Sequence, residues 1–235
     1  MIIQRIKSKL PLTEYAPKWN YPLGLETYQN TENIDIIKNW LIENENEFKK
    51  LPYTNDGGTG LGEDSVTTRY GQYNLFDYSD QLPQLDDFLR FLRLAYLDFI
   101  YQDGTDICSN DIVCWFNILR NGEEISEHAH GNSYDVYLSG NFHLDDYNTK
   151  TFYRCPQSPN LYFNVDNVKG GLTLFPSCLP HGIEIYEGTS PRVSIAFDLR
   201  VTSENRLDYK ARPFMNEEIY KTLLNQAQND NLHTS

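Results

Sequence analysis

Residues 171–182 read GLTLFPSCLPHG, and residues 190–197 read SPRVSIAF. Both stretches contain a short run of aliphatic and aromatic residues bounded by Gly, Pro or Ser, which is typical of β-strands joined by tight turns. Similar runs recur upstream at regular intervals. The predicted strands cover residues 112–119, 136–144, 151–154, 161–165, 171–175, 181–186 and 192–201. Seven or eight short strands of this kind predict a β-sandwich or a β-barrel.

The residues outside this β-rich region show a different pattern. Apolar side chains recur at three- and four-residue steps over residues 33–50 and 83–101, and again over residues 216–228, which predicts three amphipathic helices. Residues 1–30 contain three prolines and are expected to form an extended or looped lead-in, with one candidate strand at Ile2–Ile6. The predicted fold class is therefore mainly β with flanking helices, an α+β arrangement.

The length and composition favour one large domain over residues 1–235, because 40% hydrophobic content can bury a sizeable core. Its expected parts are a helical support and lid region (1–104), a β core (105–202) and a C-terminal extension (203–235). The lid is assigned to the Gly-rich segment 53–78. This segment contains GGTGLG, but no Lys-Ser or Lys-Thr pair and no predicted helix follows, so a phosphate-binding loop is not expected.

The net charge limits the partners that are expected, and the absence of targeting patterns and the cysteine spacing indicate the compartment. The net charge is −13, from 20 basic and 33 acidic residues, which repels nucleic acid and anionic membranes, so neither is expected as a partner. No apolar run is long enough for a membrane span and no signal-peptide pattern is present, so the protein is expected to be cytoplasmic. The four cysteines lack the spacing of a zinc site and are expected to be buried free thiols.

Five residues in the second half of the chain form a candidate metal site with an anionic co-ligand. His128 and His130 alternate along a predicted strand, so their imidazoles project from one face, as two ligands of one metal require. His181, in a turn after a proline, is the candidate third ligand. Arg192 and Ser194 share a strand face, and a guanidinium can bind a carboxylate through two hydrogen bonds. The alternatives are solvent-facing or structural histidines and a surface arginine.

The pattern around these residues resembles a known superfamily. Residues 171–182 are similar to the second metal-binding half of the iron(II)- and 2-oxoglutarate-dependent oxygenases, particularly their prolyl-hydroxylase-like group. Residues 190–197 resemble the strand on which that family carries an arginine, often followed by a serine. The resemblance covers about residues 110–200 and includes Trp115–Leu119, which looks like a less-characterised branch of the superfamily.

The resemblance implies a fold, a chemistry and a set of roles. The β core over 105–202 would be a double-stranded β-helix, also called a jelly roll. Fe(II) would be bound by His128, His130 and His181, and 2-oxoglutarate by Arg192 and Ser194, with Asn117 as a further contact. The implied reaction uses O2 to hydroxylate a C–H bond of a peptide, a protein or a small molecule and releases succinate and CO2. The acidic composition favours a basic or neutral substrate.

One departure from the family pattern leaves the ligand set open. Most relatives have a carboxylate two residues after the first histidine, whereas this chain has His130. Either three neutral imidazoles hold the metal or Asp135 substitutes for the missing carboxylate, and we favour three histidines because their spacing needs no further assumption. A site with three imidazoles would be one charge unit more positive.

Two further questions stay open in the sequence. Tyr137, Asn141 and His143 share one face of a predicted strand and either line the cavity or face water. The alternative functions are a three-histidine cupin-type metalloenzyme that does not use 2-oxoglutarate and a non-catalytic jelly-roll binding module. Nothing in the sequence indicates the oligomeric state.

Overall fold

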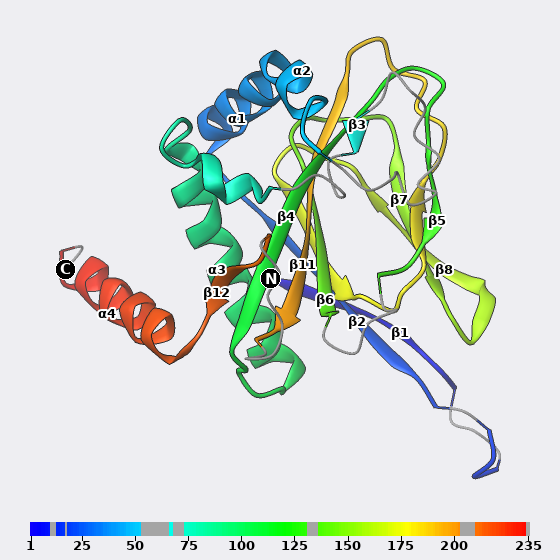
Figure 1. Cartoon of the computed structure of the whole chain (residues 1–235). Coiled ribbons are helices and arrows are strands. Elements are labelled where there is room, and N and C mark those ends of the chain that lie inside the picture. The colour runs from blue at the N-terminus through cyan, green and yellow to red at the C-terminus, as the bar shows by residue number, and fades with distance from the viewer. Residues whose placement is uncertain are drawn as a thin grey trace.

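Two antiparallel sheets form the centre of the molecule (Figure 1). The structure is a computed structural model that describes residues 1–9, 13–16, 18–52, 66–67, 73–130, 136–202 and 210–233. The larger sheet has the strand order β1 (Ile2–Lys7), β2 (Asn20–Thr27), β9 (Gly171–Pro176), β6 (Val136–His143), β11 (Arg192–Val201), β4 (Asn110–Leu119) and β12 (Arg212–Met215), with β3 (Val66–Thr67) also paired to β4. The smaller sheet has the order β5 (Ile125–His128), β10 (His181–Ile183), β7 (Lys150–Cys155) and β8 (Ser158–Asp166).

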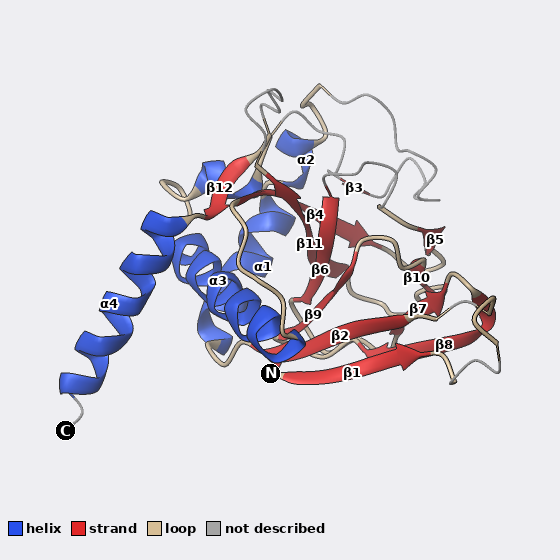
Figure 2. Ribbon diagram, turned by 90° about the horizontal axis from the view of Figure 1, so that it is seen from below, coloured by secondary structure: helices blue, strands red, loops and turns tan. Residues whose placement is uncertain are grey.

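Helices cover one face of the larger sheet, and the smaller sheet lies on its other side (Figure 2). These helices are α1 (Thr31–Glu43), α2 (Glu45–Phe48), the 3-10 helix η1 (Leu75–Tyr78) and α3 (Gln84–Asp103). The last helix, α4 (Glu217–His233), follows β12 and extends away from the sheet (Figure 1). α3 ends where Gly104 adopts a φ of 76°, a left-handed conformation that glycine enters without strain. The arrangement confirms the predicted fold class of a mainly β protein with flanking helices.

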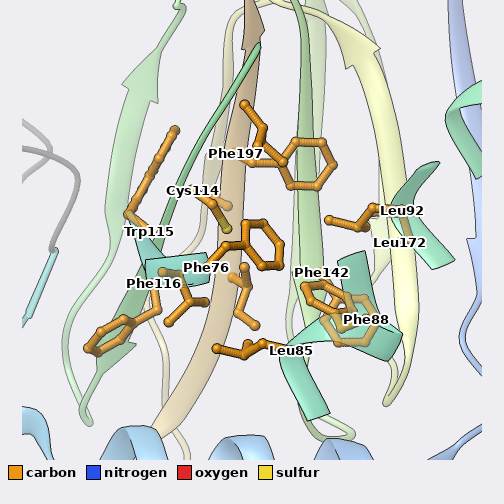
Figure 3. Packing of buried hydrophobic residues seen from close by; sticks show 14 of the residues in the cluster. Phe76, Leu85, Phe88, Leu92, Cys114, Trp115, Phe116, Phe142, Leu172 and Phe197 are labelled. Atoms are coloured by element: carbon orange, nitrogen blue, oxygen red, sulfur yellow. The ribbon is translucent and has the colours of Figure 1, made fainter. Parts of the chain in front are cut away.

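Alternation along the strands of the larger sheet separates an apolar face from a polar one. Phe116, Phe142 and Phe197 point toward the helices and are buried there with Phe88 of α3 (Figure 3). The ring centroids of Phe88 and Phe142 lie 4.6 Å apart. The opposite face, toward the smaller sheet, carries buried or half-buried polar side chains, namely Asn117, Ser139, Asn141, His143, Arg192, Ser194 and Asp198. Polar groups gathered in an interior need partners, so this layer is where a functional site is expected.

The structure corrects three details of the predicted strands. The lead-in contains a second strand, β2, in which Pro22 has a neighbouring strand on one side only, because β9 pairs with Gly24–Thr27. A missing N–H is tolerated at such a position. The C-terminal extension contributes β12, which pairs with β4. β5 ends at His128, so His130 lies beyond the strand on which both histidines were predicted.

The burial of the cysteines, the character of the helices and the position of the predicted lid can also be compared with the sequence. All four cysteines are free, and Cys114 and Cys155 are buried as predicted, but Cys108 is half-buried and Cys178 is exposed. Cys178 lies in the turn after β9. Among the described residues, no helix has the length and apolar character needed to cross a membrane. Most of the predicted lid, at 53–65 and 68–72, lies outside the described residues.

Candidate metal centre

Three histidines come together at one end of the smaller sheet. His128 ends β5 and His181 begins β10, and the two residues lie opposite each other in this antiparallel pair. His130 lies two residues beyond β5, where its backbone N–H donates to the carbonyl of Ser177 at 2.9 Å. The ring centroid of His181 lies 4.5 Å from that of His128 and 5.0 Å from that of His130. One ring nitrogen from each histidine lies within 4.8 Å of the other two, so the three side chains could hold one metal ion.

Two of the imidazoles are oriented by backbone carbonyls. Nδ1 of His128 donates to the carbonyl of Ser126 at 2.8 Å, and Nδ1 of His181 donates to the carbonyl of Leu179 at 3.0 Å. A carbonyl oxygen only accepts, so both rings carry their proton on Nδ1. Nε2 of each ring therefore carries the lone pair that can bind a metal ion.

His130 is oriented by a carboxylate instead. Its Nδ1 lies 2.5 Å from Oδ1 of Asp198, and both side chains are buried. Its Nε2 is buried and has no hydrogen-bond partner among the described residues. Buried polar atoms without a partner are rare, and a role as a metal ligand accounts for this one. The donor chemistry of the three imidazoles fits an Fe(II) ion.

Burial keeps His181 in the protonation state that can bind a metal ion. His181 is 4% exposed, and its ring lies 4.6 Å from Phe175 and 6.0 Å from Tyr153, measured between centroids. Burial, and then the neighbouring His130 and His128, lower the pKa of His181 well below its usual value. The imidazole is therefore neutral at physiological pH, as coordination requires.

Arg192 is a buried cation at the other end of the polar layer. It is 0% exposed, its Nη2 lies 3.3 Å from Nδ1 of His143, and its Nε donates to the hydroxyl of Thr149 at 3.3 Å. Its guanidinium carbon lies 5.4 Å from the ring centroid of Tyr147. Among the described residues, Nη1 is buried without a partner and no carboxylate forms an ion pair with Arg192. Burial lowers the pKa of Arg192 to about 10, which leaves the guanidinium charged at neutral pH.

His143 joins Arg192 to the histidine cluster. Burial, and then the charge of Arg192, lower the pKa of His143 well below its usual value, so this imidazole is neutral. Its Nδ1 accepts from Arg192, which places its proton on Nε2. This N–H is also buried and has no partner in the described part of the chain. Two adjacent buried groups, Nη1 of Arg192 and Nε2 of His143, therefore offer unused hydrogen-bond donors.

The three histidines open into a cavity with an empty volume of about 480 Å³, part of it open to solvent. Asn117 and Ser194 line this cavity. Arg192 does not line the cavity. It contacts His143, which does line the cavity. The guanidinium thus lies behind the cavity wall.

The sequence left open whether Tyr137, Asn141 and His143 line the cavity, and the structure gives them different environments. Asn141 and His143 line the cavity. The hydroxyl of Tyr137 instead accepts from the Asn110 side chain at 2.8 Å and lies 3.0 Å from the hydroxyl of Tyr96 on α3. Tyr137 therefore packs against the helical layer.

Two carboxylates bear on the candidate ligand set. The alternative ligand Asp135 lies outside the described residues. Asp198 was missed, although the same alternation that links Arg192 and Ser194 also brings residues 196 and 198 to that strand face. The signal was present in the sequence, but only the fold brings Asp198 to His130.

Part of the chain matches a known family. Residues 113–198, less than half of the chain, match the model of a family described as "Putative 2OG-Fe(II) oxygenase". The matched stretch includes the three histidines, Arg192, Ser194 and Asp198. No curated protein matches the chain.

Solved structures share the fold at low sequence identity. A prolyl-4-hydroxylase from Pseudomonas putida is 14% identical with a TM-score of 0.56, over 77% of this chain and 93% of that one. A prolyl hydroxylase from Trichoplax adhaerens, solved with a peptide fragment of hypoxia inducible factor, is 12% identical with a TM-score of 0.51, over 76% and 84% of the two chains. The alpha ketoglutarate-dependent carbocyclase SnoK of nogalamycin biosynthesis is 10% identical with a TM-score of 0.54, over 86% and 85%.

These likenesses agree with the resemblance that the sequence shows. The family match and the shared fold confirm the resemblance to the iron(II)- and 2-oxoglutarate-dependent oxygenase superfamily. The core of the chain is the double-stranded β-helix that the resemblance implied.

Proposed function

We propose that this protein is an Fe(II)- and 2-oxoglutarate-dependent dioxygenase that hydroxylates a C–H bond. The observation that carries the proposal is the convergence of His128, His130 and His181, whose ring nitrogens lie within 4.8 Å of one another. Their Nδ1 atoms are all engaged, so each ring presents Nε2 to one point. In this proposal these three side chains are the ligands of Fe(II).

We propose that the far carboxylate of 2-oxoglutarate is received at the end of the cavity near Arg192. Ser194 and Asn117 line the cavity there, and Nη1 of Arg192 and Nε2 of His143 are buried donors that lack an acceptor. A carboxylate supplies acceptors for both donors and a charge opposite to the uncompensated guanidinium. Because Arg192 lies behind the wall, its role requires that it reach the carboxylate beside His143.

The residues of the chain position the reactants and control water. With Fe(II) and 2-oxoglutarate bound, the site would supply the oxidising chemistry that turns O2, 2-oxoglutarate and a substrate C–H group into succinate, CO2 and an alcohol. In this proposal the histidines hold the metal, and Trp115 and Ile183 line the cavity wall with apolar surface that excludes water. Neutral His143 donates from Nε2 without adding a second positive charge.

We propose a basic or neutral peptide, or a small molecule of that character, as the substrate. The support is the net charge of −13, which disfavours an anionic substrate. The related Trichoplax adhaerens hydroxylase was solved with a peptide, whereas SnoK belongs to nogalamycin biosynthesis. Both substrate classes therefore occur on this fold.

An anaerobic titration tests the function. Fe(II) and 2-oxoglutarate are added to the wild-type protein and to Arg192→Ala, and the visible charge-transfer absorption of the chelate is recorded. We expect the absorption in the wild type and its loss in Arg192→Ala. With O2 added, succinate formation should accompany oxygen uptake.

The same measurement separates the main alternative. A three-histidine metalloenzyme that does not use 2-oxoglutarate would bind Fe(II) but give the same spectrum with and without 2-oxoglutarate. That result would refute the proposed cosubstrate. Absence of any Fe(II) binding would leave a non-catalytic jelly-roll module.

A further inference from the structure

The environment of His130 contains a charge that the candidate ligand set lacks. Asp198 lies on β11, is 2% exposed, and contacts Nδ1 of His130 through Oδ1 at 2.5 Å. The hydroxyl of Ser139 donates to the same carboxylate oxygen at 2.7 Å. The hydroxyl of Ser177 lies 2.9 Å from that of Ser139 and continues the network. The carboxylate is therefore held in place from two sides.

This contact changes the charge of the site. Three neutral imidazoles alone leave the metal one unit more positive than two imidazoles and a carboxylate do. Asp198 restores one negative charge, at a distance of one imidazole ring from the metal position. In a buried environment such a charge interacts strongly with the ion, because little water screens it.

The contact also decides which nitrogen of His130 is available. A carboxylate accepts the proton that Nδ1 carries, so Nε2 keeps its lone pair. Nε2 of His130 is indeed the buried atom without a partner. Partners of this kind set the orientation of a metal-binding histidine and raise its basicity.

We propose that Asp198 is a positioning residue that acts through His130 and holds its imidazole in place for the metal. Asp198 also supplies the negative charge that the carboxylate ligand supplies in a site of two imidazoles and one carboxylate. This inference rests on the proposed metal site and deepens it. It makes His130 and Asp198 one functional unit that spans 68 residues of sequence.

Metal affinity measures this role without catalysis. Co(II) is titrated into metal-free wild-type protein and into Asp198→Asn, and the visible absorption of bound Co(II) gives the dissociation constant. Asp198→Asn keeps the size of the side chain but removes its charge, so we expect affinity to fall about 10- to 100-fold. Ser177→Ala is the matched control, because this hydroxyl belongs to the network but does not contact His130, and its affinity should equal that of the wild type.

A second pair of variants tests whether the effect passes through His130. His130→Asp introduces a direct carboxylate ligand and removes the contact with Asp198. In that background Asp198→Asn should no longer weaken Co(II) binding. An equal loss in both backgrounds would show that Asp198 supports only the fold, and the inference would be wrong.

The tautomer of His130 gives an independent measurement in the wild-type protein, which is needed if Asp198→Asn does not fold. In ¹⁵N NMR spectra of the metal-free chain, we expect Nδ1 of His130 to carry a proton. The opposite tautomer would overturn the inference.

Failure of the inference and failure of the proposed function give different results. Unchanged Co(II) affinity in folded Asp198→Asn, together with succinate formation by the wild type, would overturn the role of Asp198 alone. A 10- to 100-fold loss without any effect of 2-oxoglutarate would uphold that role and refute the cosubstrate. A wild-type chain that binds no Co(II) would refute both.

Discussion

His181 is the residue on which the metal site can be tested most simply, because it is buried and its ring faces both other histidines. Mn(II) at about 100 times its dissociation constant should stabilise the wild-type protein by about 2.7 kcal/mol. That corresponds to a rise in Tm of roughly 5–10 °C for a domain of this size. We expect His181→Ala to abolish the rise, as measured by thermal unfolding followed by circular dichroism.

The control for this measurement is His143→Gln. His143 is also buried, but it contacts Arg192 and does not belong to the histidine cluster. Mn(II) should raise the Tm of His143→Gln as much as that of the wild type. A rise that persists in His181→Ala would mean that the metal binds elsewhere.

A substitution at Arg192 tests the proposed binding site for the far carboxylate of 2-oxoglutarate. Arg192→Lys keeps the charge but removes the planar fork and the contact of Nε with Thr149. Charge-assisted hydrogen bonds contribute about 1.5–3 kcal/mol, so the affinity for 2-oxoglutarate should fall roughly 10- to 150-fold. Calorimetric titration of the Mn(II)-loaded protein measures this.

Arg154→Lys is the matched control, since Arg154 pairs with Glu127 at the surface of the smaller sheet. It should bind 2-oxoglutarate with wild-type affinity. If Arg192→Lys also binds normally, the guanidinium is structural and the carboxylate lies elsewhere.

At the scale of the strand, Gly140 shows how closely β6 and β11 pack. A methyl group at Gly140 would lie 2.2 Å from the Phe197 ring, on the apolar face of the sheet. Gly140→Ala should therefore lower the free energy of unfolding by about 1–3 kcal/mol, measured by urea unfolding. Metal affinity should change little, because the histidines line the cavity on the opposite, polar face of this sheet.

The smaller side chain of Phe197→Leu provides the control for this contact. The double variant Gly140→Ala/Phe197→Leu should lose less stability than the sum of the two single variants. Additive losses would mean that the Phe197 ring does not limit the space at Gly140.

At the scale of the whole molecule, two buried neutral histidines make stability depend on pH. Burial holds the pKa values of His143 and His181 well below 6.5 in the folded chain. Below pH 6.5 the unfolded chain binds protons at both residues and the folded chain does not. The free energy of unfolding of the metal-free protein should fall by up to about 1.4 kcal/mol per pH unit for each histidine.

Urea midpoints at pH 7.5, 6.5 and 5.5 in the presence of a chelator measure this slope. His143→Gln removes one of the two contributions and should make the slope shallower between pH 6.5 and 5.5. A stability that is constant or rises in this range would contradict the burial of the neutral imidazoles.

The sequence predicted much of the element order, because local patterns determine it. The strands β4, β6 to β9 and β11 and the helices α1 and α3 follow periodicities that are visible in a single segment. β2 was missed because Pro22 is a breaker by local rules, and its tolerance depends on which strands pair beside it. β12 was missed for a related reason, since only its pairing with β4 defines it.

Taken by itself, the sequence determined the candidate donors, because the spacing of His128, His130 and His181 and the strand face of Arg192 and Ser194 are local patterns. Only the tertiary structure decided how they meet. It places Asp198 against His130 and His143 against Arg192, contacts that span 68 and 49 residues of chain. The physical reason is that strand pairing and burial, which set both the charge and the tautomer of these groups, come from segments far apart in the sequence.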